Sequence, residues 1–280
     1  MDMKHIIQCG DSLKLIKSIP YNSVDLIVTS PPYWAKRVYN GAGEIGSEAT
    51  PEKYVERLAD FFDQLRPYLK PTGNVFINVG DTFFGSGAGA WSKYLDNHGN
   101  ETETLKERKE KYFTLKPLQP KIKQDGKLYQ NKQNRGWLLR DDIIWYKPNR
   151  IPASVKDRFN NMYEHVFHFV LKKKYFFDLE AVKVPGISNH RPKNPGDVWD
   201  IKTQPLKGPH TATFPEKLVE RIVLCGSPIN GYVLDPFLGT GTTWVVCERL
   251  QRNCIGFEIN REFFDSAKER FQEQYGAEEK

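Results

Sequence analysis

The side chains best suited to chemistry lie in one short segment, Ser30-Pro31-Pro32-Tyr33, which follows the apolar run 26–29. That run is typical of a buried parallel strand, and α/β sheets bind their ligands where such strands end. Both prolines lack an N–H group, so the segment is stiff and offers carbonyl acceptors beside the Ser30 hydroxyl and the Tyr33 ring. These groups suit a planar ring with an NH2 group, because the acceptors take the amine hydrogens while the tyrosine stacks on the ring. A proline-containing turn with no chemical role is the alternative that the segment alone leaves open.

A second candidate segment is the turn Asp235-Pro236-Phe237-Leu238-Gly239-Thr240-Gly241-Thr242-Thr243, between a strand pattern at 232–234 and a helix pattern that continues to about Leu250. Gly239 and Gly241 permit a tight turn and a close backbone approach to a ligand, and the helix N-terminus supplies free N–H groups. The next strand pattern ends in Glu258, where nucleotide-binding sheets place an acid that receives ribose hydroxyls.

The chemistry of this turn favours a ligand that carries an ammonium group. The turn lacks the third glycine of the dinucleotide-binding fingerprint, and it begins with the acidic Asp235, which repels a pyrophosphate. S-adenosyl-L-methionine has such an ammonium group. A nicotinamide-dependent oxidoreductase is the competing enzyme class, and both the missing glycine and the Ser-Pro-Pro-Tyr segment count against it.

The elements around these segments alternate between helix and strand. Strand patterns at 5–9, 24–30, 74–79 and 142–146, with helix patterns at 12–19 and 51–69, predict a parallel sheet covered on both faces. The stretches Glu164–Leu171 and Tyr175–Asp178 predict an antiparallel hairpin at the sheet edge. Asp11 follows the first strand, where it either caps the next helix or contacts a ligand, and its position leaves both roles open.

The composition excludes several kinds of site. The four cysteines are scattered without a Cys-x-x-Cys, and His165 and His168 lie three apart in a strand, so they face opposite ways. We therefore expect no metal site and no disulfide framework. The chain opens without the apolar core of a signal peptide and has no apolar run of the roughly 20 residues that span a bilayer. We expect a soluble, cytoplasmic protein with no membrane partner.

The positive charge of the chain is concentrated in one stretch. The net charge is +6, and Gly85 to Arg135 holds eleven Lys and Arg residues against six Asp and Glu residues. Aromatic residues are interleaved with the lysines, and the stretch shows no clear periodicity. It is too long for an ordinary connection within a domain, so it is either a solvated mobile loop or an insertion that contacts phosphates.

Taken together, these segments resemble the amino methyltransferases of DNA. Ser-Pro-Pro-Tyr is matched at 30–33, and the adenosylmethionine loop Asp-Pro-Phe-x-Gly-x-Gly-Thr-Thr is matched in full at 235–243. Further matches at 142–149, 158–161, 164–167 and 213–218 extend the resemblance over nearly all of the chain outside 85–135. The catalytic motif precedes the cofactor motif, as in the β-type arrangement of that family. Ser30, where the adenine-modifying members more often carry Asp or Asn, resembles the cytosine-N4 branch.

The resemblance implies a fold and a set of site residues. The fold is an α/β, doubly wound, mostly parallel seven-stranded sheet with an antiparallel edge hairpin. It forms a single methyltransferase domain over 1–280, with a basic insertion at about 85–135 and a candidate target-recognition segment at about 183–208. The implied catalytic residues are Ser30, Pro31, Pro32 and Tyr33. The implied cofactor-binding residues are Asp235, Pro236, Phe237, Gly239, Gly241 and Thr242 in the turn, Glu258 at the ribose, Asp11 with Ile259 at the adenine, and Thr213, Phe214 and Pro215 closing the pocket.

The resemblance also implies an activity. It is the transfer of a methyl group from S-adenosyl-L-methionine to the N4 amine of a flipped cytosine at a specific site in double-stranded DNA. A cognate restriction endonuclease would act on the same site without a stable complex, and the protein would be a monomer or homodimer. N6-adenine methylation of DNA is the first alternative, followed by methylation of RNA and by DNA binding without catalysis. The recognition sequence cannot be read from the chain.

Overall fold

The computed structural model describes residues 4–34, 45–80, 136–150, 159–186, 191–204 and 214–276. The chain forms two units, one of Met1–Gly80 with Gly136–Lys280 and the other of Asp81–Arg135. The second unit holds the predicted basic insertion at about 85–135 and lies outside the described residues.

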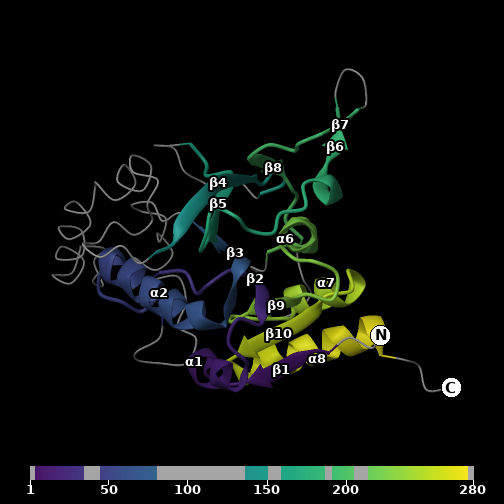
Figure 1. Ribbon diagram of the computed structural model, residues 1–280. Helices are drawn as coiled ribbons and strands as arrows, with labels where there is room; N and C mark the ends of the chain where they lie inside the picture. The colour runs from purple at the N-terminus through teal and green to yellow at the C-terminus, as the bar shows by residue number, and fades with distance from the viewer. Residues whose placement is uncertain are drawn as a thin grey trace. The chain divides into compact units, whose positions relative to one another are not determined.

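The first unit is built on a sheet of eight strands in the order β1-β10-β9-β2-β3-β5-β4-β8 (Figure 1). The first five strands are parallel, β5 is antiparallel to both of its neighbours, and β8 is parallel to β4. The predicted mostly parallel sheet is confirmed, with β8 as an eighth strand beyond the seven expected. In sheet order, the strands are β1 (Ile6–Cys9), β10 (Asn253–Glu258), β9 (Tyr232–Asp235), β2 (Val24–Thr29), β3 (Leu69–Val79), β5 (Tyr163–Val170), β4 (Leu138–Tyr146) and β8 (Val198–Asp200).

The chain changes direction across the sheet between β9 and β2. These two strands are parallel neighbours, with Leu26 opposite Val233 and Ile27 opposite Leu234. From β9 the chain passes through α7 (Thr242–Arg249) to β10 on one side, and from β2 it passes through α2 (Pro51–Leu65) to β3 on the other. The loops that follow β9 and β2 therefore lie side by side, at the position where doubly wound sheets bind ligands.

Helices cover both faces of the sheet. The helices α6 (Glu216–Gly226), α7 and α8 (Arg261–Tyr275) lie on one face, and α1 (Ser12–Leu15) and α2 lie on the other (Figure 1). Leu26 and Phe76 of the sheet share a buried apolar cluster with Leu218 of α6. Burial of this kind supplies most of the driving force for folding. Among the described residues, three short 3-10 helices lie at Ile16–Ser18, Arg66–Tyr68 and Glu180–Val182.

The predicted partner in the edge hairpin is wrong. The antiparallel partner of β5 is β4, with Asp142 opposite Phe167, and the other side of β5 is taken by β3. Because both edges of β5 are already paired, Tyr175–Asp178 forms no strand. Its aromatic rings instead pack on His168, at centroid distances of 5.6 Å for Tyr175 and 6.0 Å for Phe177. The aromatic residues of this segment therefore serve packing rather than strand pairing.

The two histidines of β5 have separate partners, as their spacing predicts. His165 Nδ1 lies 2.6 Å from Asp142 Oδ1. His168 is fully buried, with Nε2 2.9 Å from Asn74 Oδ1 and its ring stacked on Phe76. Burial lowers the pKa of His168. Neither histidine belongs to a metal cluster, and no group of three His, Cys, Asp or Glu side chains among the described residues could hold an ion.

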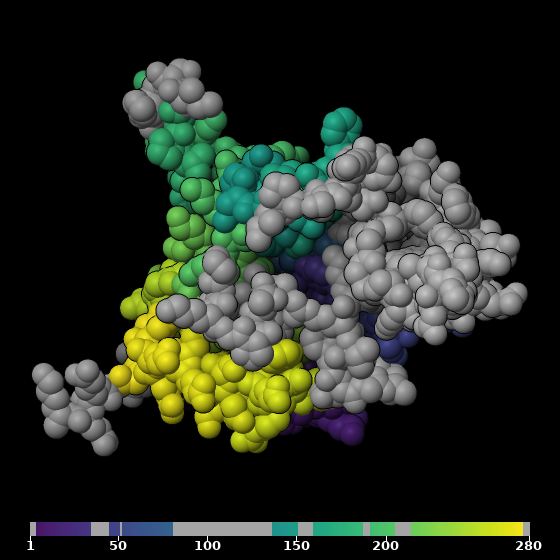
Figure 2. Space-filling model, turned by 180° about the vertical axis from the view of Figure 1, so that it is seen from behind, coloured from purple at the N-terminus to yellow at the C-terminus, as the bar shows by residue number. Residues whose placement is uncertain are grey.

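A small antiparallel ribbon lies apart from the main sheet. It pairs β6 (Val184–Pro185) with β7 (Pro192–Lys193), inside the candidate target-recognition segment. Figure 1 shows this ribbon standing away from the eight-stranded sheet, and in the space-filling view of Figure 2 the green residues of this part of the chain project outward. Across the described ranges, no helix combines the length and apolar character needed to cross a membrane.

Candidate active site

Asp235, the last residue of β9, joins the two strands at the centre of the sheet. Its carboxylate is fully buried and accepts hydrogen bonds from Thr29 Oγ1 at 2.7 Å and from Thr243 Oγ1 at 2.6 Å. The Phe237 N–H donates to it as well, at 3.1 Å. Since Thr29 ends β2 and Thr243 lies in the first turn of α7, one side chain fixes both candidate loops relative to each other.

Burial raises the pKa of Asp235 to about 6, although the three hydrogen bonds act in the opposite direction. The cause is desolvation, which disfavours the ionised form when no cation lies close by. The geometry differs from the predicted direct contact with a ligand ammonium group. With no exposed surface and three donors from the protein, Asp235 shapes the turn from beneath.

The glycines of the turn have the conformations that the sequence predicts. Gly239 and Gly241 have φ angles of +56° and +79°, in the left-handed region that favours glycine. A Cβ on Gly241 would lie 3.0 Å from the Cβ of Ala267, so α8 also requires a glycine there. Gly241 is the N-cap of α7 and makes no side-chain cap bond, which leaves the first N–H groups of the helix available to a ligand.

Glu258 lies at the end of β10, beside the same turn. Its Oε2 accepts from the Gly239 N–H at 2.7 Å and its Oε1 accepts from the Asn260 N–H at 2.8 Å. Burial raises the pKa of Glu258. Each carboxylate oxygen has two lone pairs, so Glu258 can accept two further hydrogen bonds from hydroxyl groups of a ligand.

Asp11 caps α1. Its Oδ1 accepts from the N–H groups of Leu13 at 2.8 Å and Lys14 at 3.3 Å. The next residue, Ser12, donates its hydroxyl to the Pro236 carbonyl at 2.5 Å, which holds the start of α1 against the turn after β9. Of the two roles left open for Asp11, capping is the one that the structure displays. Its side chain is exposed, as is Ile259, in the loop after β10.

The predicted pocket-closing segment is described only in part. Thr213 lies outside the described residues. Phe214 packs against the buried core, and Pro215 is the N-cap of α6 without a side-chain cap bond. This segment is linked to the glycine turn through Arg270, which the sequence offered no reason to single out.

Arg270 of α8 contacts two sides of the candidate pocket. Its Nη1 donates to Thr242 Oγ1 at 2.9 Å and to the Thr240 carbonyl at 3.3 Å. Its Nη2 donates to Glu216 at 2.8 Å, in the first turn of α6. Arg249 binds the other oxygen of Glu216 at 2.6 Å, so the carboxylate lies between two guanidinium groups. Burial acts against ionisation, but the two arginines keep the pKa of Glu216 below its ordinary value.

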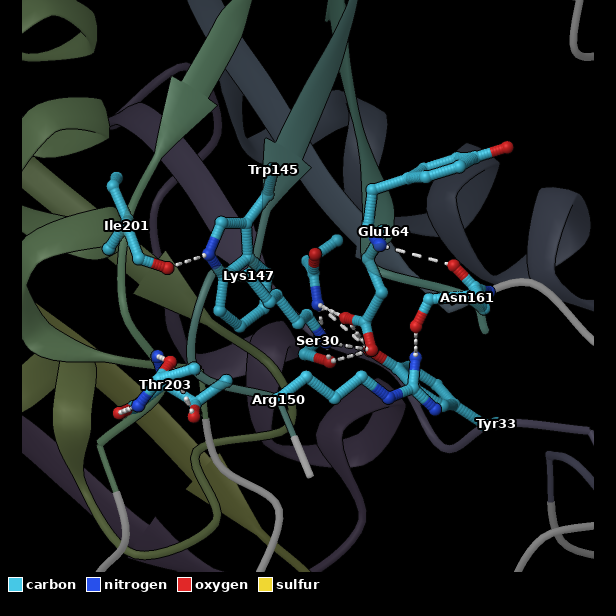
Figure 3. A network of polar contacts seen from close by, with 12 residues as sticks. Ser30, Tyr33, Trp145, Lys147, Arg150, Asn161, Glu164, Ile201 and Thr203 are labelled. Carbon is cyan, nitrogen blue, oxygen red and sulfur yellow. Dashed lines mark hydrogen bonds and ion pairs between the residues drawn. The ribbon is translucent and has the colours of Figure 1, made fainter. Parts of the chain in front are cut away.

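The Ser-Pro-Pro-Tyr segment begins a second polar network. Ser30 Oγ donates to Tyr33 Oη at 3.3 Å, and Tyr33 Oη donates to Glu164 Oε2 at 2.9 Å. Asn78, near the end of β3, donates to Tyr33 Oη at 2.8 Å and to Glu164 Oε2 at 2.9 Å. The other oxygen of Glu164 forms an ion pair with Lys147. Figure 3 shows the side chains of Ser30, Tyr33 and Lys147 converging on the Glu164 carboxylate.

The backbone around this network fixes the Tyr33 ring. A Cβ on Gly80 would lie 2.6 Å from Cε2 of Tyr33, so the ring packs directly on the chain after β3. Tyr54 of α2 donates to the Pro32 carbonyl at 2.9 Å. No described residue donates to the Pro31 carbonyl. Together with the Ser30 hydroxyl, this carbonyl is the acceptor that the segment can offer to a ligand.

Sequence reasoning missed three members of the network. Glu164 and Lys147 lie in stretches that match the amino methyltransferases, yet neither was assigned a role, and Asn78 was counted only as part of a strand. Each lies at the same edge of the sheet as Ser30, because β3 and β4 end there and the antiparallel β5 begins there. The topology could have indicated this convergence once the β4–β5 pairing was known.

Comparison of the sequence with known proteins places this chain in a family. A family model for N6 and N4 methyltransferases, described as DNA methylase, matches residues 24–269. The chain belongs to the DNA methylase family. M.SmaI, a type II methyltransferase of Serratia marcescens, is 40% identical over 264 residues, which are 93% of this chain and 88% of M.SmaI. M.Cfr9I, a type II methyltransferase of Citrobacter freundii, is 36% identical over 94% of this chain and 86% of its own.

Solved structures share the fold of this DNA methylase. The PvuII DNA methyltransferase, which is cytosine-N4-specific, has a TM-score of 0.65 and 23% identity over 95% of this chain and 85% of its own. M1.HpyAVI, solved as a complex with SAM, has a TM-score of 0.55 and 22% identity over 95% and 98% of the two chains. The predicted resemblance to the amino methyltransferases of DNA and the predicted fold class are confirmed.

The buried Asp235 predicts a specific dependence of stability on pH. Between about pH 4 and pH 6 the folded protein keeps this carboxyl protonated while the unfolded chain ionises it. The folded state then binds more protons, so the contribution of Asp235 to stability falls as pH rises. With a pKa raised from 3.8 to about 6, the loss reaches about 3 kcal/mol by neutral pH.

The measurement is urea unfolding of the parent and of Asp235→Asn across this pH range. The free energy of unfolding of the parent should fall by about 3 kcal/mol relative to that of the variant between pH 4 and pH 7. Asp265→Asn, on the exposed face of α8, is the matched control and should show no such trend. Parallel curves of unfolding free energy against pH for Asp235→Asn and the parent would contradict a raised pKa for Asp235.

Proposed function

We propose that this DNA methylase transfers a methyl group from S-adenosyl-L-methionine to the N4 amine of a flipped cytosine at a specific site in double-stranded DNA. The observation that carries the proposal is the adjacency of two loops. The acceptor-rich segment after β2 and the glycine turn after β9 lie at the carboxyl ends of neighbouring parallel strands and share the Asp235 carboxylate. Cofactor and base would meet in the crevice between them.

The residues of the turn fit S-adenosyl-L-methionine. The backbone of Gly239 and Gly241 would lie along the methionine part, with Asp235, Pro236, Phe237 and Thr242 holding the turn in shape. Phe237 stacks on Phe61 of α2 at 4.8 Å, which fixes that side of the turn. Glu258 would accept the ribose hydroxyls with its remaining lone pairs. Asp11 and Ile259 would lie at the adenine, and Thr213, Phe214 and Pro215 would close the pocket.

The Ser-Pro-Pro-Tyr segment would prepare the amine. An exocyclic amine is a weak nucleophile because its lone pair is delocalised into the ring. Ser30 Oγ and the Pro31 carbonyl would accept its two hydrogens, favour a pyramidal nitrogen and stabilise the positive charge that develops there. Tyr33 would stack on the flipped base. S-adenosyl-L-methionine would supply the methyl group on a sulfonium, so that the N–CH3 bond forms as the S–CH3 bond breaks, and water would take the proton that the amine loses.

The turn generates a prediction on cofactor affinity. Asp235→Ala leaves Thr29, Thr243 and the Phe237 N–H without their shared acceptor, and Arg270→Gln releases the turn from α6. Each should weaken S-adenosyl-L-methionine binding at least tenfold, because a charge-assisted hydrogen bond contributes about 1.5–3 kcal/mol. Calorimetric titration measures the affinity. The control is Arg261→Gln, which changes an exposed arginine of α8, the helix that carries Arg270, and should bind the cofactor as the parent does. Parent-like affinity in Asp235→Ala would remove Asp235 from the site.

The product is the decisive prediction. We expect N4-methylcytosine in duplex DNA, supported by Ser30 in the motif and by the fold shared with a cytosine-N4-specific enzyme. DNA modified in a methylation-free host is digested to nucleosides, which are separated by mass and retention. N6-methyladenine as the sole product would overturn the choice of cytosine and leave the fold in place.

Ser30→Ala should lower turnover far more than it lowers cofactor affinity, because the contact of the Ser30 hydroxyl with the amine strengthens as the amine becomes pyramidal.

Two segments outside the catalytic network are proposed to contact DNA. The ribbon of β6 and β7, within 183–208, carries Lys183, Arg191 and Lys193, and a two-stranded ribbon of this kind fits the major groove. The basic stretch at about 85–135 is proposed to bind phosphates. A restriction endonuclease would cut the same site without a stable complex, as the type II names of the relatives suggest, and the protein would act as a monomer or homodimer.

The basic stretch is tested by removing its charge. Neutralising Lys121, Lys123 and Lys127 together to Gln should weaken DNA binding irrespective of sequence. The log–log slope of affinity against salt should fall by about 0.9 for each phosphate that the variant no longer neutralises. Fluorescence anisotropy with specific and non-specific duplexes measures both quantities, and cofactor affinity serves as the internal control. A salt slope identical to that of the parent would make the stretch a solvated loop.

A further inference from the structure

The ion pair of Lys147 and Glu164 lies beneath the catalytic segment, and neither residue belongs to the proposed catalytic or cofactor-binding sets. We propose that this pair sets the direction of the hydrogen bonds that end on Ser30, and that it makes Ser30 an acceptor toward the substrate. Glu164 and Lys147 are thus positioning residues that select an NH2-bearing base. The proposal rests on the proposed function, because it explains how the same segment recognises its target.

Glu164 is ionised because of its surroundings. Its side chain is 13% exposed, and that of Lys147 is 9% exposed. Burial alone would raise the pKa of Glu164, but the Lys147 ammonium and the hydrogen bonds from Asn78 and Tyr33 bring it below its ordinary value. At neutral pH the group is a carboxylate. It has no proton to give and can only accept hydrogen bonds.

The Glu164 carboxylate fixes the direction of the hydrogen bonds between it and Ser30. Since Glu164 only accepts, Tyr33 must donate its hydroxyl hydrogen to Oε2, at 2.9 Å. Burial and the same carboxylate hold the pKa of Tyr33 well above its ordinary value, so the hydroxyl keeps that hydrogen. The lone pairs of Tyr33 Oη then face Asn78 and Ser30. Ser30 directs its hydrogen to Tyr33, and one of its lone pairs faces Asn78 Nδ2 at 3.5 Å, which leaves the other lone pair of Ser30 Oγ for the substrate.

The amide of Asn78 supports the same direction. Its Nδ2 has two hydrogens and donates them to Tyr33 Oη at 2.8 Å and Glu164 Oε2 at 2.9 Å, the shortest of its contacts in the network. Turning the amide round would place Oδ1 against the Glu164 carboxylate, where two acceptors repel each other. The carboxylate therefore orients Asn78 as well as Tyr33, and every hydrogen in the network points toward Glu164.

This direction has a consequence for substrate choice. With Ser30 Oγ and the Pro31 carbonyl both acting as acceptors, the pocket receives the two hydrogens of an exocyclic amine. The carbonyl oxygen of thymine or uracil at the same place would meet two acceptors and no donor. An unpaired buried polar group costs about 1–3 kcal/mol. The ion pair thus contributes to discrimination between an amino and a keto pyrimidine, although it makes no contact with the base.

Few other ionisable groups surround this pair. In the described part of the site, Glu164 of β5 is faced by Lys147 after β4, by Tyr33 after β2 and by the neutral Asn78 of β3. Tyr54 of α2 lies next, with its hydroxyl on the Pro32 carbonyl. Lys147 also lies 4.1 Å from the centre of the Trp145 ring. Lys147 is therefore the cation that keeps Glu164 ionised.

The test measures methyl transfer to a target duplex as a function of pH. Glu164→Gln should lower kcat by about 100-fold at neutral pH, as loss of a preorganised polar contact does, and change the KM for S-adenosyl-L-methionine by less than about twofold. Lys147→Met leaves Glu164 buried without its cation, so the carboxyl becomes protonated near neutrality. The kcat of Lys147→Met should then rise about tenfold per pH unit as Glu164 ionises. Lys147→Arg keeps the charge and should retain the parent's profile.

A double-mutant cycle with Tyr33→Phe provides a second, independent measurement. Without the Tyr33 hydroxyl only the long contact of Asn78 with Ser30 Oγ, at 3.5 Å, still connects Glu164 to Ser30. Glu164→Gln should therefore cost less than about threefold in that background. Glu220→Gln, at an exposed ion pair of α6, is the matched control and should behave as the parent. If Lys147→Met does not fold, this cycle alone tests whether Glu164 acts on Ser30 through Tyr33.

Three results would overturn the proposal. They are parent-like kcat in Glu164→Gln, a pH profile of Lys147→Met parallel to that of the parent, and an undiminished cost of Glu164→Gln in the Tyr33→Phe background. Failure of the proposed function is a separate outcome, because parent-like turnover in Ser30→Ala would remove the segment itself from catalysis. Loss of turnover in Ser30→Ala together with any of the three results rejects only the role of the ion pair.

Discussion

The hydrogen bonds to Asp235 determine whether the two halves of the site face each other. Thr29 ends β2, Thr243 lies in the first turn of α7, and both donate to one carboxylate within 2.7 Å. A carboxylate suits this position because all three of its neighbours are donors and it accepts from each of them. The cost is a buried charge without a nearby cation, which appears as a pKa raised to about 6. Stability is therefore lower at neutral pH, while the geometry of the crevice is fixed.

The buried carboxylates of this site differ in their surroundings. Asp235 is surrounded by hydroxyl and N–H donors, and burial dominates its pKa. Glu164 is almost as buried and burial raises its pKa too, but Lys147 together with the hydrogen bonds from Asn78 and Tyr33 outweighs burial and lowers the pKa. The first group holds backbone loops, for which either protonation state can keep some contacts. The second must remain ionised, since a protonated Glu164 could donate to Tyr33 and reverse every hydrogen bond up to Ser30.

Local patterns in the sequence were sufficient to predict seven of the eight strands of the sheet, the helices α1, α2 and α7 and both motif loops, but not β8, α6 or α8. Ser30 and Gly241 could be found in this way because strand ends and tight turns depend on neighbouring residues. The pairing of Tyr175–Asp178 was predicted wrongly, since a run of aromatic residues looks the same in the sequence whether it pairs as a strand or packs on His168. Long-range contacts were missed for a related reason. Tyr33 and Glu164 are 131 positions apart, and Thr29 and Asp235 are 206 apart, so no local pattern relates them.

The Lys147–Glu164 pair holds the loop at a large cost in desolvation free energy. Desolvation of two charges often cancels the attraction between them, and apolar replacements of similar size are frequently as stable or more so. A Met and Leu pair could fill the same space, but it would offer no acceptor to Tyr33 and Asn78 and would leave the Ser30 hydroxyl free to rotate. A freely rotating hydroxyl donates or accepts equally well, and so accommodates amino and keto groups alike. The buried charge is better explained by the single hydrogen-bond direction that it imposes than by any gain in stability.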